Sequence, residues 1–181
     1  RAEEFLFPKH LDDSISQRLI CPLDIIKGMV PFFQTTVSAY LTFLSNNGIE
    51  VAEQWTVGFN YAYITRCNAG DFTASRRGHP GTLSCICILK TPDEDGEGSS
   101  KSESSDKSGR IELSYGTPSA FYKENMLITP KVGDFYMFPS SLAIRLYPFK
   151  SNGELRFFSA CLSISESSEE EGPSWPTLLQ D

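Results

Sequence analysis

The stretch TPKVGDFYMFPSSLAIRLYPFKSNGELRFFSACLS, residues 129–163, decides the fold of this chain. It holds three runs rich in aromatic and aliphatic residues, 134–138, 143–147 and 155–163, and Pro139, Pro148 and Gly153 lie between them. Short apolar runs bounded by Gly, Pro and Asn turn signals are typical of β-strands, whereas helices need longer periodic segments. The stretch therefore predicts three consecutive short strands.

The pattern continues upstream, where 58–66, 82–90 and 111–115 also predict strands. Before them, residues 31–46 carry apolar side chains at three- and four-residue steps, which predicts a helix opened by Pro31 and ended by Asn47-Gly48. Residues 1–22 predict an extended N-terminal extension with a short helix over 11–20. The predicted fold is mainly β (α+β), with a jelly-roll core at 23–164 under an N-terminal helical layer.

Two segments differ in composition from this domain. Residues 92–109 form an acidic, Ser/Gly-rich stretch with almost no apolar side chains, which predicts a solvated loop inserted between two strands. Residues 165–181 begin as an acidic serine run and end with Trp175, Leu178 and Leu179. This tail is either a disordered end or a short docking motif for another protein subunit, and the sequence leaves both interpretations open.

Composition excludes several classes of function. The 181 residues carry a formal net charge of −7, which argues against direct binding of a nucleic-acid backbone. No apolar run reaches the ~20 residues of a membrane-spanning helix. Five scattered cysteines predict reduced core residues and an intracellular, soluble protein. Because the chain begins at Arg1, both a removed targeting peptide, with an organelle location, and a trimmed chain are compatible with it.

The 129–163 stretch resembles the C-terminal half of the 2-oxoglutarate/iron(II) dioxygenases, whose fold is a double-stranded β-helix. In that family a Gly-Asp turn leads into a strand ending in Phe-Pro-Ser, as Gly133-Asp134 and Phe138-Pro139-Ser140 do here. A later Gly-Glu turn precedes an arginine, matched by Gly153-Glu154-Leu155-Arg156. Residues 70–89 are similar, more loosely, to the segment that supplies the first iron ligands. The resemblance covers about 49–163.

The resemblance also implies where the metal ligands of the family would fall. Ile144 takes the place of the distal histidine, and Arg77 and His79 fall where His-x-His or His-x-Asp is expected. The chain has two histidines, His10 and His79, so no histidine follows position 79. Since such an iron site uses two imidazoles and one carboxylate, the prediction is a degenerate site without a conventional metal or other cofactor.

Arg156, 12 residues after Ile144, corresponds to the family's 2-oxoglutarate carboxylate clamp. It is either a retained clamp or a structural arginine paired with Glu154. The leading hypothesis is a non-catalytic dioxygenase-like domain that serves as a structural or accessory subunit of a larger protein assembly. The alternatives are an active, prolyl hydroxylase-like oxygenase using Fe(II) and 2-oxoglutarate at an atypical site, completed by His10 or another chain, and a metal-free dicarboxylate sensor.

Overall fold

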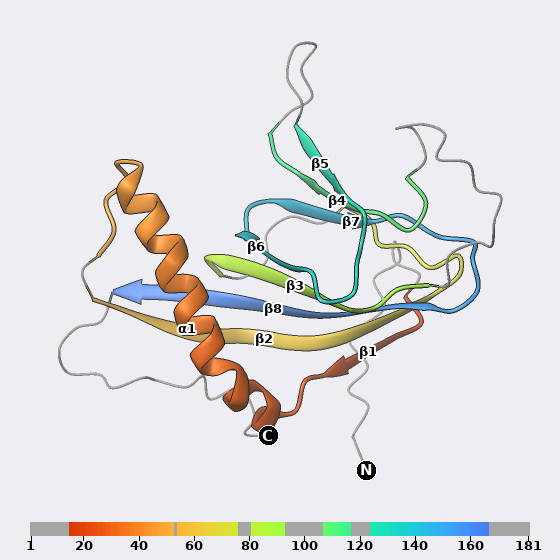
Figure 1. Ribbon diagram of the computed structural model, residues 1–181, viewed down its shortest axis with the longest axis horizontal. Coiled ribbons are helices and arrows are strands. Elements are labelled where there is room, and N and C mark those ends of the chain that lie inside the picture. Colours follow the sequence, from red (N-terminus) through yellow and green to blue (C-terminus); the bar gives the residue numbers. More distant parts are fainter. Residues whose placement is uncertain (1–14, 53, 76–80, 93–106, 117–123, 167–181) are drawn as a thin grey trace.

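The computed structural model describes residues 15–52, 54–75, 81–92, 107–116 and 124–166. These residues form one helix and eight strands (Figure 1). In chain order the elements are β1 (Gln17–Ile20), α1 (Leu23–Asn46), β2 (Trp55–Asn68), β3 (Leu83–Lys90), β4 (Ile111–Ser114), β5 (Asn125–Ile128), β6 (Phe135–Pro139), β7 (Ala143–Leu146) and β8 (Glu154–Glu166). No helix within these residues has the length and apolar character needed to cross a bilayer.

The strands make two antiparallel sheets. The large sheet has the order β1-β2-β8-β3-β6, and the small sheet has the order β5-β4-β7. Strands β2 and β8 form the long central pair, with a register shift between Phe59 and Tyr61 that marks a β-bulge. Because side chains alternate across a strand, each strand of the large sheet offers one set of residues to each of its two faces.

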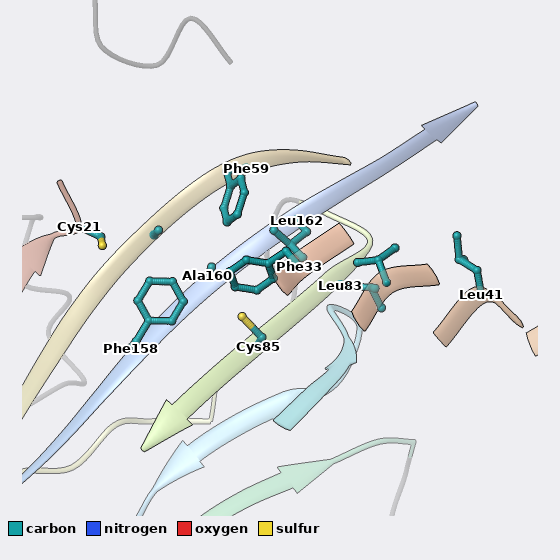
Figure 2. Packing of buried hydrophobic residues seen from close by; sticks show 11 residues of the cluster. Cys21, Phe33, Leu41, Phe59, Leu83, Cys85, Phe158, Ala160 and Leu162 are labelled. Atoms are coloured by element: carbon teal, nitrogen blue, oxygen red, sulfur yellow. The ribbon is translucent and has the colours of Figure 1, made fainter. Parts of the chain in front are cut away.

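Helix α1 covers one face of the large sheet and crosses β2 and β8 (Figure 1). Its buried stripe is Phe33, Val37 and Leu41, at four-residue steps. Phe33 lies edge-on to Phe59 of β2, with 5.1 Å between ring centroids. Figure 2 shows Phe33 among buried side chains from β2, β3 and β8. This cluster fixes the helix on the sheet.

The small sheet packs against the opposite face of the large one. Leu155 and Phe157 of β8 face it, whereas their neighbours Phe158 and Ala160 face α1. Buried residues from both sheets make up this second cluster: Cys67, Ile86, Ile88, Ile111, Leu113, Ile128, Phe138, Leu146, Phe149, Leu155 and Phe157. The molecule therefore has three layers, and the large sheet contributes to both cores.

The mainly β prediction is confirmed, and six of the predicted strands are present with small differences at their ends. Two local predictions were wrong. The helix begins at Leu23, so Pro31 lies inside it, and residues 17–20 form β1 rather than a helix. Strand β5 was not predicted. The helical layer is a single helix within the described residues. Most of the predicted 92–109 loop and the 165–181 tail lie outside those residues.

Candidate functional site

The two sheets enclose a cavity of about 70 Å³. Its walls come from all five strands of the large sheet, from the small sheet, and from the segment that follows β2. The lining residues are Arg18, Tyr61, Tyr63, Thr65, Thr73, Ala74, Ser84, Cys85, Ile86, Ile111, Phe138, Ile144, Leu146, Phe157, Ser159 and Ala160. The cavity is thus a feature of the sheet pairing and not of one loop.

The large sheet gives the cavity a polar side. Arg18 lies directly across from Thr65 in the β1–β2 pairing, and Tyr63 lies across from Ser159 in the β2–β8 pairing. The Arg18 guanidinium lies over the ring of Tyr63, with 5.4 Å from Cζ to the ring centroid. Tyr61 stacks on Tyr63 at 5.2 Å. Cross-strand pairing therefore places a cation, two phenols and two aliphatic hydroxyls beside one another.

The phenol of Tyr61 stays neutral at this site. Burial is the main cause of its strongly raised pKa, and the neighbouring Tyr63 and Cys161 raise the pKa further. A neutral phenol can both donate and accept a hydrogen bond. Tyr61 is therefore a poor general base near neutral pH.

The small sheet gives the cavity an apolar side. Ile144 of β7 lines it together with Leu146 and Ile111. Arg145 points away, because its neighbours on both sides face inward. Its guanidinium lies 5.8 Å from the ring of Tyr147, near Glu112 on the outer face of this sheet. Hence the predicted distal-ligand position does face the cavity, and it carries a hydrocarbon side chain.

Segment 72–74 closes the side of the cavity next to β7. The Thr73 amide donates to the Leu146 carbonyl at 3.2 Å, and the Leu146 amide donates to Thr73 Oγ1 at 2.8 Å. Just before it, the Asp71 carboxylate accepts hydrogen bonds from the amides of Ser16 and Asn68, both at 2.8 Å. Asp71 therefore has a structural role, since it ties the residue just before β1 to the turn after β2.

Arg156 lies elsewhere and is not among the residues that line the cavity. Its guanidinium contacts Glu154 at 2.5 Å. Arg66 and Lys90, from the strands on either side, also pair with Glu154. Burial acts to raise the pKa of Glu154, but the hydrogen bond from Lys90 and the charges of Arg156 and Arg66 outweigh it, so the pKa is lowered. The clamp role of Arg156 remains a prediction, and the contact observed is structural.

The cysteines behave as core residues, as predicted. All five are free, and four of them are buried. Burial raises the pKa of Cys85 to about 12, so this thiol stays protonated and is a poor nucleophile.

The described residues contain no group of three or more His, Cys, Asp and Glu side chains that could hold a metal ion. Arg77, His79, His10 and the tail residues Trp175, Leu178 and Leu179 lie outside these residues.

Comparison with known proteins supports the fold. No family model and no curated protein matches the chain. Among solved structures, the chain is similar to the viral collagen prolyl hydroxylase vCPH of Paramecium Bursaria Chlorella virus-1, in its 2OG complex. The match has a TM-score of 0.51 at 15% sequence identity and covers 83% of this chain and 80% of the viral one. At this identity the likeness concerns the fold alone.

The described residues of the cavity do not supply the iron ligands that the family resemblance implies. Non-haem iron oxygenases of this type bind the metal through two histidines and one carboxylate. No His, Asp or Glu lines the cavity within the described residues, and Ile144 has no donor atom. Arg18, the one cation among the described residues that line the cavity, would oppose a nearby metal ion.

Sequence reasoning missed the polar side of the cavity. Tyr61, Tyr63 and Thr65 recur at two-residue steps, which shows that they share one face of a strand but not that the face is an inner one. No sequence feature indicated that Arg18 lines the cavity, because the local pattern of residues 11–20 predicts a helix. Its position depends on the pairing of Arg18 with Thr65, 47 residues further along the chain.

Proposed function

We propose that this chain is a non-catalytic dioxygenase-like domain of the double-stranded β-helix type. In this proposal it serves as a structural or accessory subunit of a larger protein assembly. The observation that carries the proposal is Ile144, which lines the cavity at the position where the family resemblance requires a histidine ligand. An aliphatic side chain at that place packs the interior and offers nothing to a metal.

The histidine content of the chain supports the same conclusion without any alignment. The two histidines are His10 and His79, so β7 and β8 carry none. A ligand set of two imidazoles and a carboxylate would have to use both His10 and His79. It would also have to form in a cavity that Arg18 lines. A fold does not fix a function, so the absence of catalysis is tested directly.

The test is iron binding and turnover. The protein is incubated anaerobically with Fe(II) and 2-oxoglutarate, desalted, and assayed for iron per chain and for 2-oxoglutarate decarboxylation in air. We expect iron well below one per chain and no decarboxylation above a buffer control. The His79→Ala and His10→Ala variants serve as matched controls, because any residual iron that they do not lower is nonspecific. One iron per chain with turnover would make the protein an active oxygenase with an atypical metal site.

The outer face of α1 supports the subunit role. No charged residue occurs between Lys27 and Glu50, although a solvent-facing helix surface usually carries many. Ala39 and Thr42 are exposed on this face, and Phe43 is 61% exposed. Protein interfaces are depleted of charged residues at their centre. We therefore place a neutral surface of another subunit against α1, with Trp175, Leu178 and Leu179 of the tail as a second anchor.

Size measurements test the subunit role. In an extract of its source, the wild-type chain should run in a particle far larger than its own 20.2 kDa. Ala39→Glu places a charge at the centre of the α1 face and should release the free chain. Lys27→Glu changes charge at one end of the helix and is the matched control. If Ala39→Glu leaves the particle intact, the contact lies elsewhere on the domain.

A further inference from the structure

Thr65 is a buried polar residue whose hydroxyl has no partner within the described part of the chain. Its side chain is fully buried, with 0% exposure, and its Oγ1 atom makes no hydrogen bond there. It lies near the C-terminal end of β2 and lines the cavity between the sheets. Buried hydroxyls almost always have a partner, because an unmade hydrogen bond costs free energy. The orphan hydroxyl therefore indicates that something polar occupies the cavity.

The chemistry of the neighbouring residues indicates which polar group this is. Arg18 lies directly across from Thr65 in the β1–β2 pairing. It is the one charged side chain among the described residues that line the cavity. A guanidinium stays protonated, and its planar set of donors matches a carboxylate. The hydroxyls of Tyr63 and Ser159 lie on the same polar side and can donate to the second oxygen of such a group.

The size of the cavity limits the occupant. At about 70 Å³, it is well below the roughly 300–1,000 Å³ of pockets that take drug-sized ligands. It exceeds the space for one water, which needs about 10–15 Å³ on this measure. Ile144, Leu146 and Phe157 supply an apolar wall that suits a short hydrocarbon group. The fit is to a carboxylate with a chain of one or two carbons.

We propose that the cavity between the two sheets is a binding site for a small aliphatic monocarboxylate, with Arg18 as its anchor and Thr65 as a second donor. The carboxylate lies against the polar side formed by β1, β2 and β8, and the hydrocarbon end lies against β7. This site differs from the predicted clamp at Arg156, whose side chain is on the opposite face of β8. The carboxylate-binding proposal does not depend on the proposed subunit role. The outcome of the iron assay neither supports nor contradicts it.

Acetate and propionate are suitable probes. The thermal midpoint of the full chain is measured against increasing sodium acetate or propionate, with the ionic strength held constant by sodium chloride and the pH held constant by a separate buffer. Binding to the folded state raises the midpoint as the ligand concentration passes its dissociation constant. We expect a rise with either carboxylate and none with chloride alone. No rise with either carboxylate overturns the proposal.

Two arginine variants locate the site. Arg18→Met keeps the aliphatic stem but removes the charge, and it should weaken binding about tenfold or more, as the loss of a charged hydrogen bond does. Arg156→Met is the matched comparison on the other face of the sheet and should leave the affinity unchanged. If instead Arg156→Met abolishes binding and Arg18→Met does not, the site is at Arg156 and the proposal is wrong.

The Thr65→Val variant tests the same site even if Arg18→Met does not fold. Valine has nearly the shape of threonine, and here it removes a hydroxyl without a partner, so the ligand-free protein should be as stable as wild type or more stable. The same change should reduce the midpoint shift given by acetate. A variant that is stable and binds acetate as tightly as wild type would show that Thr65 does not contact the ligand, against the proposal.

Discussion

Gly81 shows how closely the chain approaches β8 at a single residue. A Cβ atom at this position would lie 2.6 Å from Cys161 Sγ and 2.6 Å from the Leu162 carbonyl oxygen. The next residue is held there, because the Thr82 amide donates to the same carbonyl at 2.7 Å. Neither the strand backbone nor the buried thiol can move away cheaply, since the interior is close-packed. Only glycine fits.

We therefore expect Gly81→Ala to lower the free energy of unfolding by about 1–3 kcal/mol, the usual cost of overpacking. Gly58→Ala is the matched control, because no atom lies within 4 Å of the position that its methyl group would take, and its backbone is extended in β2. That change should stay within about 0.5 kcal/mol of wild type. Urea unfolding measures both variants. Equal stability of the two would show that the turn before β3 can relax.

At the scale of elements, one acidic residue joins three strands at the end of the large sheet. Glu154 of β8 is 4% exposed and pairs with Arg66 of β2, Lys90 of β3 and Arg156. Its pKa is lowered, because these partners outweigh the effect of burial. A carboxylate with a lowered pKa in the folded state binds its proton less tightly there than in the unfolded chain. It therefore stabilises the fold above the ordinary glutamate pKa.

This stabilisation should disappear as the pH falls from about 4.5, the unperturbed value, through the lower folded-state pKa. Glu154→Gln mimics the protonated side chain, so it should destabilise the protein at pH 7 and match wild type increasingly well in acid. Urea unfolding of both proteins at several pH values measures the difference. A stability difference that is the same at pH 3 and pH 7 would contradict the role of the charge.

Elements with their own turn signals could be predicted, and those that depend on distant partners could not. β6, β7 and the start of β8 were predicted to within one residue, because Pro139 marks the end of β6 and Gly153 precedes β8, whereas β8 continues three residues beyond its predicted end. Strand β1 has four residues and is defined by its pairing with β2, which no local pattern encodes. The same holds for the site. Ile144 was placed in it through a motif, whereas Arg18 depends on that long-range pairing.

The start of α1 was missed for a different reason. Both Pro22 and Pro31 precede helix-forming segments, and proline is common at the first position of a helix. The helix begins after Pro22 and continues through Pro31, whose missing amide costs one backbone hydrogen bond. Packing of Phe33, Val37 and Leu41 against the sheet offsets that loss. Tertiary contacts, which the local sequence does not show, thus decided the boundary.

For the whole molecule, the shared large sheet should make the three layers unfold together. Phe33 connects α1 to three strands, since its ring lies 5.1 Å from Phe59, 6.1 Å from Phe135 and 6.3 Å from Phe158. Phe157, the residue just before Phe158 in β8, packs in the core on the other face. Unfolding of the core on one face of the large sheet therefore destabilises the core on the other face, because alternate residues of the same strands pack in both cores.

We expect Phe33→Ala to lower the free energy of unfolding by about 3–5 kcal/mol, as for other buried phenylalanines. The loss should appear as one transition at lower urea, with the same midpoint by far-UV circular dichroism and by tryptophan fluorescence. Phe43→Ala, on the exposed side of the same helix, should shift the midpoint little, because Phe43 is 61% exposed. If Phe33→Ala instead separates the two signals, α1 detaches before the sheets open. The cavity between the sheets would then survive without the helix, and carboxylate binding could be measured in that intermediate.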